Sequence, residues 1–284
     1  MRIAFQGETG AFGEAAAERI DADAPRVACA TFDGVFDAVA RGPATYGVLP
    51  IENSIAGTIH QTYDLLLEHE LSIVGEVEVP VVHHLLAPRG ATIDRIRRIY
   101  SHPQALAQCE RFLRTLTGVE IVAGANTAGC ARRVAEEGRS DAAAIASARA
   151  ADAFGLMSLA TGIQDFADNV TRFIVVGRRP LADQIADKTT VVFSLANEPG
   201  SLFRALGVFA LRNVDLTKLE SRPMRGRPWE YLFYAELAAA RDELPCARAL
   251  QHLAELAPTL RVLGSYRAWR EPDRGTYDPL ELGA

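Results

Sequence analysis

The chain has 284 residues, of which 49% are hydrophobic and 23% are charged, and its formal net charge is −6. These proportions are typical of a globular protein with enough apolar material for one large or two ordinary domains. The negative charge excludes a general nucleic-acid surface, which needs clustered lysine and arginine, but it permits an anionic ligand bound by local donors. Because no apolar run approaches the roughly 20 residues of a membrane span, we expect no membrane partner.

The four cysteines are widely spaced and form no CxxC pair; they are Cys29, Cys109, Cys130 and Cys246. This spacing favours free thiols in a reducing compartment over a disulfide framework or a zinc site. The N-terminal segment Met1–Gln6 has the pattern of an opening strand and not of a signal peptide. We therefore expect a cytoplasmic protein that uses no metal and no other cofactor.

Short apolar runs alternate with amphipathic segments of helical period through the first 179 residues. Strands are predicted at Arg2–Gln6, Gly47–Pro50, Leu71–Val79, Arg97–Tyr100, Val119–Ala123, Ala142–Ala146 and Phe173–Gly177. Helices are predicted between them at Ala11–Arg19, Gly34–Ala40, Thr58–Glu68, Pro103–Leu116, Ala128–Glu137 and Ala148–Phe154. This alternation favours an α/β fold with parallel sheets.

A second unit follows a polar segment, residues 180–188, that we interpret as a linker. Its predicted elements are strand Thr189–Ala196, helix Gly200–Arg212, strand Val214–Glu220, strand Glu230–Ala239, helix Leu244–Ala257 and strand Leu260–Ala268. This βαββαβ order predicts a ferredoxin-like sandwich over 189–268, followed by a loosely held tail at 269–284. The face that the first helix lays on the sheet is predicted to comprise Leu202, Leu206, Phe209 and Ala210.

Small polar residues stand where predicted strands give way to helices: Thr9, Asn53 with Ser54, Ser101, Asn126 with Thr127, and Ser147. Any one of them, taken alone, is most simply explained as a helix N-cap. In α/β proteins, however, ligands bind beyond the carboxyl ends of strands, where helix N-termini offer N–H groups and partial positive charge to anions. Together these residues predict a crevice that suits a small dicarboxylate.

Several other chemistries lack the residues that they need. The glycines of Gly7–Gly13 follow GxxGxxG and not the GxGxxG of dinucleotide-binding proteins, so a tight turn is the simpler interpretation. The pair His83-His84 lacks a third metal ligand at helical spacing and is predicted to be packed or on the surface. Neither Ser54 nor Ser101 lies in a GxSxG elbow, which disfavours covalent catalysis.

Three motifs occur in a fixed order: Pro50–Ser54, Ser101–Leu106 and Asn169–Phe173. Together they resemble the motifs of the prephenate dehydratases, which make phenylpyruvate on the route to phenylalanine. The likeness covers nearly the whole chain and includes a C-terminal segment similar to a ligand-sensing ACT domain. It implies a two-lobed, periplasmic-binding-protein-like catalytic domain over 1–179, with lobes at about 1–77 plus 160–179 and at 78–159, before an ACT domain at 189–268.

The resemblance also implies the residues of the active site. Thr171 matches the family's threonine most closely tied to activity, and we expect it to hydrogen-bond the hydroxyl that leaves prephenate. The expected substrate-binding residues are Thr9, Glu52, Asn53, Ser54, Ser101, His102, Gln104, Asn169, Arg172 and Phe173. Two alternatives stay open, because Glu52 can instead pair with a nearby arginine and His102 can be purely structural.

The C-terminal unit resembles ACT domains that bind amino acids at subunit interfaces. The residues expected to bind L-phenylalanine as an inhibitor are Asn197, Pro199, Gly200, Ser201, Leu202, Asp215, Glu220, Ser221, Arg222 and Pro223. The family more often has Gly-Ala-Leu and a small residue where this chain has Gly200–Phe203, and bulky Phe203 bears on the selectivity of the pocket. The likeness implies a homo-oligomer, dimer or tetramer, through both domains, although a dimerising sheet without ligand is the alternative.

Two other functions remain open from the sequence. The first is an arogenate dehydratase, which performs the same elimination on the amino-acid analogue of prephenate. The second is a non-catalytic solute-binding or amino-acid-sensing protein, because a two-lobed crevice and an ACT module both suit ligand sensing.

Overall fold

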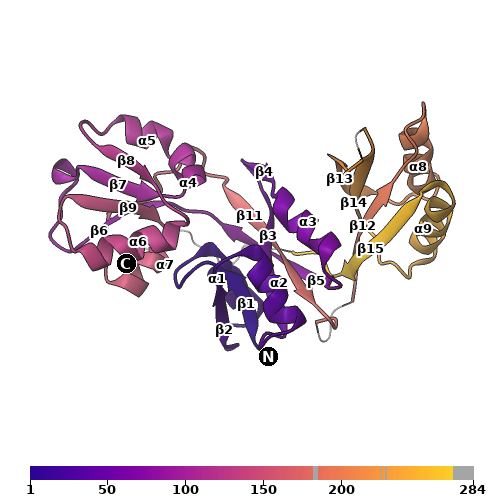
Figure 1. Cartoon of the computed structure of the whole chain (residues 1–284), viewed down its shortest axis with the longest axis horizontal. Helices are drawn as coiled ribbons and strands as arrows, with labels where there is room; N and C mark the ends of the chain where they lie inside the picture. Colours follow the sequence, from indigo (N-terminus) through magenta and orange to yellow (C-terminus); the bar gives the residue numbers. More distant parts are fainter. Residues whose placement is uncertain (182–184, 225, 228, 271–284) are drawn as a thin grey trace. The chain divides into compact units, whose positions relative to one another are not determined.

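The computed structural model describes residues 1–181, 185–224, 226–227 and 229–270. The chain divides into two compact units, Met1–Ala182 and Asp183–Ala284 (Figure 1). The division falls inside the segment predicted as a linker. Residues 182–184 of that segment, like residues 271–284 of the predicted tail, lie outside the described residues.

The first sheet of the N-terminal unit has the strand order β2-β1-β3-β11-β5, with β4 paired to β3. Its strands are β1 (Ile3–Gln6), β2 (Arg26–Cys29), β3 (Tyr46–Asn53), β4 (Gly57–Thr58), β5 (Ser72–Pro80) and β11 (Val170–Gly177). The helices packed on it are α1 (Phe12–Ile20), α2 (Phe32–Ala40) and α3 (His60–Glu68). Strand β1 runs parallel to both neighbours, whereas β11 runs antiparallel to β3 and β5.

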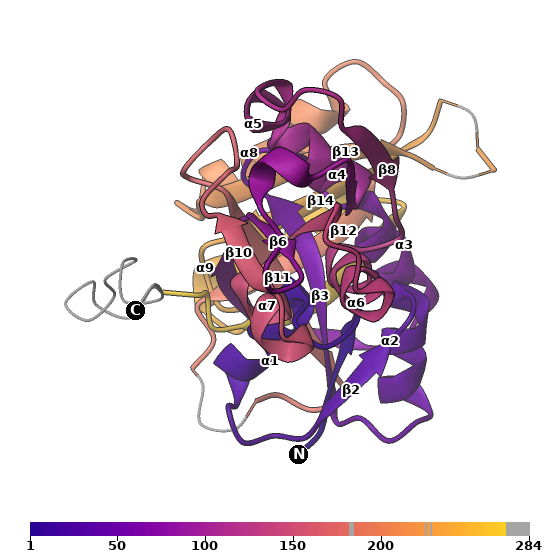
Figure 2. The same cartoon turned by 90° about the vertical axis from the view of Figure 1, so that its left-hand side faces the viewer.

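The second sheet has the order β10-β6-β9-β7-β8. Its strands are β6 (His84–Ala87), β7 (Arg98–Ser101), β8 (Glu120–Ala123), β9 (Ala142–Ala146) and β10 (Met157–Ala160). Its helices are η1 (Ile93–Arg95), α4 (Pro103–Gln108), α5 (Glu110–Arg114), α6 (Thr127–Glu137) and α7 (Ala148–Phe154). Helices α4 and α5 cover one face and α6 and α7 the other (Figures 1 and 2), each over its own buried cluster. The chain crosses between the sheets at 81–83 and 161–169.

The prediction of parallel sheets is wrong, because both sheets are mixed. Strand β11 returns antiparallel after the second crossing, and β6 pairs antiparallel with β9 and β10. Strands β2, β4, β6 and β10 were not predicted. Strand β2 is only partly buried and β4 has two residues, so neither carries a strong apolar pattern.

The predicted helix Pro103–Leu116 is interrupted at Cys109, where the chain turns into α5. Asp165, from the second crossing, accounts for the interruption. Its backbone N–H donates to the Gln108 carbonyl at 2.7 Å, and its carboxylate accepts from the Arg111 N–H at 3.0 Å. The long-range partner thus satisfies backbone groups that a continuous helix would have paired internally.

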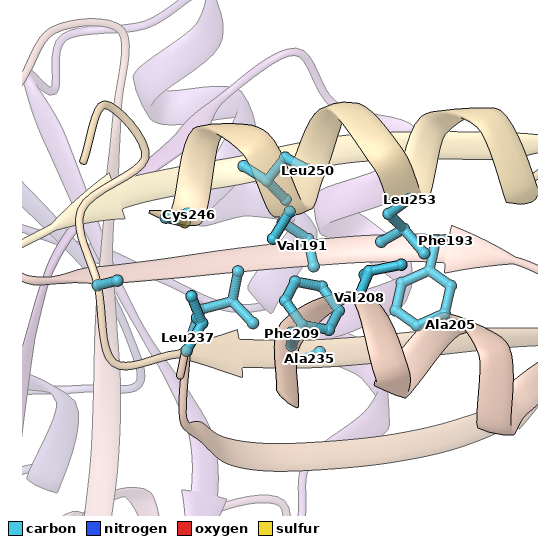
Figure 3. Close-up of a cluster of buried hydrophobic side chains, with 13 residues drawn as sticks. Val191, Phe193, Ala205, Val208, Phe209, Ala235, Leu237, Cys246, Leu250 and Leu253 are labelled. Atoms are coloured by element: carbon cyan, nitrogen blue, oxygen red, sulfur yellow. The ribbon is translucent and has the colours of Figure 1, made fainter. Parts of the chain in front are cut away.

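The second unit is a four-stranded antiparallel sheet of order β13-β14-β12-β15 with two helices, which confirms the predicted ferredoxin-like sandwich. Its elements are β12 (Lys188–Ser194), α8 (Ser201–Ala210), β13 (Leu216–Pro223), β14 (Tyr231–Leu237), α9 (Leu244–Leu256) and β15 (Thr259–Tyr266). Figure 3 shows its core, in which Phe209 of α8 and Leu253 of α9 lie between the helices and the sheet, near Val191 of β12.

Candidate active site

A cavity of about 520 Å³ opens in the N-terminal unit. It is lined by the β1–α1 and β2–α2 turns, the end of β3, helix α4, the start of α6 and strand β11. Its polar lining consists of Gln6, Thr31, Asn53, Gln61, His83, His102, Gln104, Gln108, Asn126, Thr127 and Thr171. Its aromatic lining comprises Phe12, Phe32, Phe173 and the two histidines just named. None of the described residues that line it is aspartate, glutamate, lysine or arginine.

Four helices of nine or more residues, α1, α2, α3 and α6, begin at this lining. Thr31 caps α2 by accepting from the Gly34 N–H at 3.0 Å, and Asn126 caps α6 by accepting from the Gly129 N–H at 2.6 Å. The positive ends of four helix dipoles therefore lie at a cavity whose described lining residues carry no formal charge. Such an environment favours anions without the desolvation of a lysine or arginine.

The hydroxyl of Thr171 lies opposite Asn53 across the β11–β3 pair. The Asn53 Nδ2 group donates to Thr171 Oγ1 over 3.0 Å, and both side chains line the cavity. No described residue accepts a hydrogen bond from this hydroxyl. Because its oxygen already accepts from an amide, the hydroxyl proton of Thr171 is available to a ligand, and the incoming bond makes it a better donor.

The orientation of the Asn53 amide is fixed by the backbone that follows it. Its Oδ1 atom accepts from the N–H groups of Ile55 at 3.1 Å and Ala56 at 2.9 Å. Since those groups can only donate, the oxygen must face them and the NH₂ group must face Thr171. The end of strand β3 thereby sets the direction of the hydrogen bond from Asn53 to Thr171.

The polar chain continues from Asn53 away from Thr171. Asn53 Nδ2 also donates to Asn169 Oδ1 at 2.8 Å, and Asn169 Nδ2 donates to Gln108 Oε1 at 3.0 Å. The same Gln108 oxygen lies 2.9 Å from His83 Nε2. Five side chains from β3, β11, α4 and the two crossings thus form one hydrogen-bonded series.

Both histidines of the cavity are neutral near pH 7, because burial lowers the pKa of His83 and of His102 below the ordinary value. His102 is the N-cap of α4, and its Nδ1 atom accepts from the Gln104 N–H at 3.2 Å. His102 thus caps a helix and also lines the cavity, and its contact with substrate stays a prediction.

Of the residues predicted to bind substrate or to act on it, the structure brings Asn53, His102, Gln104, Thr171 and Phe173 into the cavity lining. Asn169 is buried behind them, one hydrogen bond from Asn53.

The remaining predicted residues lie outside the lining. Thr9 is exposed on the β1–α1 turn. Ser54 bridges the backbone, because its hydroxyl donates to the Asp168 carbonyl at 2.8 Å and accepts from the Val170 N–H at 2.9 Å. Ser101 is fully buried and donates to the Ile145 carbonyl at 2.6 Å, a bond that ties β7 to β9. The hydroxyls of both serines therefore stabilise the backbone of the fold.

Arg172 and Glu52 also lie outside the lining. Arg172 points away from Thr171, as alternation along a strand requires. Its guanidinium pairs with Glu52 at 2.7 Å and with Glu76 at 2.9 Å. In the structure Glu52 therefore pairs with an arginine, which is one of the alternatives that the sequence left open.

Sequence reasoning missed His83, Gln108 and the two aromatic residues Phe12 and Phe32. Gln108 could have been predicted as a site residue, because it follows Gln104 by four residues and so lies on the same face of the helix. No sequence pattern indicated His83, because it lies in the first crossing between the sheets, a segment without helical or strand periodicity.

The profile of the prephenate dehydratase family matches residues 3–181, and that of the ACT domain matches residues 189–251. The chain belongs to the prephenate dehydratase family. The "arogenate dehydratase/prephenate dehydratase 2, chloroplastic" of Arabidopsis thaliana is 49% identical over 94% of this chain and 72% of its own length. Arogenate dehydratase 2 of Petunia hybrida is 47% identical over 94% and 71%.

Solved structures agree with this membership. A prephenate dehydratase from Arthrobacter aurescens in complex with L-Phe superposes with a TM-score of 0.86 at 35% identity, over 94% of this chain and 90% of that one. A structure described as GqqA, a novel type of quorum quenching acylase, gives 0.86 at 37% identity, over 95% and 98%. As a prephenate dehydratase family member, the chain is a carbon–oxygen lyase with a two-lobed catalytic domain and a C-terminal ACT domain.

In the ACT unit, most residues predicted to bind phenylalanine lie at one end of the sheet. Asn197, Pro199 and Gly200 form the exposed turn that starts α8, where Gly200 has φ +82°. The register aligns Ser194, Leu232 and Arg222 across the sheet, which brings Glu220–Pro223 to the same end as Ser201 and Leu202. Asp215 precedes β13 at the opposite end and is not brought together with the others.

Among the described residues, no helix is both long and apolar enough to cross a membrane. Within the same residues, no group of three or more histidines, cysteines or acidic residues is placed to hold a metal ion. His83 and His84 diverge, since His83 contacts Gln108 and the His84 Nδ1 atom lies 3.4 Å from the Ser158 hydroxyl.

Proposed function

We propose that this chain catalyses the decarboxylating dehydration of prephenate to phenylpyruvate, carbon dioxide and water, with Thr171 as the catalytic residue. The observation that carries the proposal is the Thr171 hydroxyl, whose oxygen accepts from Asn53 at 3.0 Å and whose proton is available to a ligand in an uncharged cavity.

The direction of charge movement explains why one hydroxyl donor suffices. When the ring carboxylate leaves as carbon dioxide, its electron pair enters the ring and the C–O bond to the hydroxyl breaks. Negative charge therefore leaves the carboxylate and develops on the departing oxygen. A donor placed at that oxygen binds the transition state more tightly than the ground state. Thr171 supplies this donor, and the proton that completes the water is relayed to the hydroxide through it or through solvent.

The second carboxylate of prephenate keeps its charge throughout. We propose that it binds where α1, α2 and α6 begin, near Thr31, Asn126 and Thr127. Hydrogen bonds to this group act equally on the ground and transition states, so they position the ring without stabilising it selectively.

The lining supports prephenate over arogenate as the preferred substrate. Arogenate carries an ammonium group on its side chain, and a buried ammonium group needs an anionic or strong acceptor partner. The described lining residues include no aspartate or glutamate, whereas the helix N-termini repel a cation. We therefore expect the larger kcat/KM for prephenate.

We further propose that L-phenylalanine inhibits the enzyme from the ACT unit, at the α8 turn and the Glu220–Pro223 end of β13. Support comes from the Arthrobacter aurescens relative, which was solved with L-Phe. A homo-oligomer, dimer or tetramer, accompanies this proposal. Phe203 of α8 and Leu211, the residue that caps its C-terminus, expose 81% and 82% of their surface, an apolar area that a partner subunit would cover.

The cytoplasm is the proposed location, because the four cysteines are all free and suit a reducing compartment. Several plant relatives carry "chloroplastic" in their names, so fractionation of cells that express the chain tests this point.

The deciding experiment incubates the purified chain with prephenate and, separately, with arogenate, and follows phenylpyruvate and phenylalanine. We expect phenylpyruvate to form and kcat/KM to be higher for prephenate. A higher kcat/KM for arogenate would assign the alternative substrate. Binding of either compound without turnover would instead support a sensing protein and contradict the proposed enzymatic function.

A further inference from the structure

We propose that His83 is a positioning residue for the dehydration, acting through Gln108, Asn169 and Asn53 on the hydroxyl of Thr171. This inference rests on the proposed function, because it concerns the same site.

The donor and acceptor directions along the hydrogen-bonded series require His83 to be a donor. Asn53 is fixed by two backbone donors, so its NH₂ group faces both Thr171 and Asn169. Asn169 must then accept with its oxygen and donate with its nitrogen to Gln108 Oε1. That oxygen can accept from His83 only if the imidazole proton resides on Nε2. His83 is thus the terminal donor of the series.

The other ring nitrogen favours the same tautomer. His83 Nδ1 is buried and has no hydrogen-bond partner among the described residues. A proton on Nδ1 would bury an unpaired N–H and would leave Nε2 facing the Gln108 oxygen without a proton. Protonation of both nitrogens would bury an unpaired charged donor. The environment thus selects the neutral form that donates from Nε2.

The surroundings of His83 hold its ring in place. Its backbone N–H donates to Gln164 Oε1 at 3.0 Å, and its carbonyl accepts from the Ile163 N–H at 3.0 Å. The imidazole ring packs at right angles to the Phe12 ring, with the two ring centroids 5.8 Å apart. His83 therefore connects the two crossings to the N-terminus of α1 at the cavity.

A packed histidine without function is the competing explanation, and it predicts different behaviour. If His83 only fills space, a leucine of similar volume would retain activity. If His83 positions Gln108, removing its N–H frees the Gln108 amide to rotate. Asn169 and Asn53 then lose a fixed partner, and the Thr171 hydroxyl samples unproductive directions. Such an effect lowers kcat more than it changes KM, because the residues proposed to bind the second carboxylate, where α1, α2 and α6 begin, are unaltered.

The test is a double-mutant cycle on prephenate with His83→Leu, His83→Gln, Gln108→Leu and the double variant His83→Leu/Gln108→Leu. We expect His83→Leu to lower kcat roughly 10- to 100-fold, as for groups that orient catalytic ligands, with KM within about twofold. His83→Gln can place an N–H near the position of Nε2 and should recover most of kcat. The double variant should be no slower than Gln108→Leu, because the side-chain hydrogen bonds among the described residues connect His83 to Thr171 through Gln108.

The neighbouring His84→Gln variant is the matched control, because His84 lies outside the cavity lining and contacts Ser158. It should keep the activity of the parent enzyme. Near-normal kcat in His83→Leu, or losses that add in the double variant, would overturn the proposal.

A second measurement separates this inference from the proposed function. Nitrogen NMR of the histidines in the ligand-free enzyme should show His83 as a neutral imidazole protonated on Nε2, and Gln108→Leu should shift that resonance. A proton on Nδ1, or a cationic ring at neutral pH, would overturn the positioning role even if prephenate is turned over. The expected tautomer in a protein without turnover would mean that the proposed function had failed and the series had not.

Discussion

At the scale of single residues, Asn53 uses the two ends of one amide for two tasks. Its oxygen holds the backbone of Ile55 and Ala56, and its nitrogen aims at Thr171. A change that keeps the first task and removes the second tests what the amide nitrogen contributes.

Asn53→Asp is that change. A carboxylate still accepts from both backbone N–H groups, but it cannot donate to the Thr171 oxygen and it repels an anionic substrate. We expect kcat/KM for prephenate to fall roughly 10²–10³-fold, the cost of losing one preorganised donor, while the circular dichroism spectrum is unchanged. Asn53→Ala, which removes both tasks, should also lower the melting temperature. Activity of Asn53→Asp within twofold of the parent would contradict the role of the amide.

The sequence motifs located this residue-level chemistry but could not assign each member's task. Thr171, Asn53 and Gln104 lie in the cavity lining, whereas Ser101, from the same motif as Gln104, donates its hydroxyl to a backbone carbonyl. A motif shows which residues accompany one another along a chain. Whether a hydroxyl faces a ligand or a carbonyl depends on β9, which is more than 40 residues from Ser101 and reaches it only in the fold.

At the scale of elements, the β1–α1 turn fits against helix α7 at Gly10. Gly10 has φ +86°, and a Cβ atom there would lie 2.6 Å from Ala150 Cα. Gly90 has the same φ of +86° but no atom within 4 Å of the position of its Cβ. The two glycines therefore separate the cost of backbone strain from the cost of a steric clash.

We expect Gly90→Ala to lower the free energy of unfolding by about 1–2 kcal/mol, the cost of placing an L-residue in the left-handed region. Gly10→Ala should cost more than Gly90→Ala and should also lower activity, since the turn must move away from Ala150. Urea denaturation of both variants measures the difference. Equal losses would show that the turn does not pack against α7 as closely as described.

Helix α6 provides a second test at this scale, because its N-cap Asn126 also lines the cavity. Asn126→Ala removes the cap and should cost about 1 kcal/mol of stability and raise KM for prephenate, as the helix N-terminus frays. Asn126→Ser keeps a capping oxygen and should restore both. Unchanged KM in Asn126→Ala, measured beside a lowered melting temperature, would exclude the α6 terminus from substrate binding.

The helices also show where periodicity is ambiguous. The predicted face of α8 included Leu202 and Ala210, which are exposed, whereas Ser201, Ala205 and Val208 are buried with Phe209. The helix is apolar on more than one side, so sequence alone could not choose the face. The exposed side carries Phe203 and Leu211 and is the surface for which we propose a partner subunit.

At the scale of the whole molecule, the order of elements was predictable and the direction of some strands was not. The alternation of apolar runs located most strands, and the βαββαβ order identified the ACT fold. Strand β11 became antiparallel because the chain crosses between the sheets twice, at 81–83 and 161–169, and no local pattern encodes that path. The same crossings deliver His83 and Asn169 to the active site, which explains why the cavity was only partly predicted.

Regulation by phenylalanine is also a property of the whole molecule. We expect L-phenylalanine to raise the melting temperature and lower kcat of the parent enzyme. Gly200→Ala strains the α8 turn, where φ is +82°, and should abolish both responses while activity without phenylalanine is retained. Asp215→Ala, at the opposite end of β13, should leave both responses intact. The reverse outcome, in which only Asp215→Ala is insensitive, would move the effector site.

The central claim concerns the Thr171 hydroxyl, and turnover of prephenate by Thr171→Ser and Thr171→Val tests it most directly. Serine keeps the hydroxyl, and valine keeps the shape of threonine without it. We predict that Thr171→Ser retains kcat within about tenfold and that Thr171→Val loses roughly 10²–10³-fold, with both proteins folded. A Thr171→Val enzyme that forms phenylpyruvate at nearly the parent rate would contradict the account.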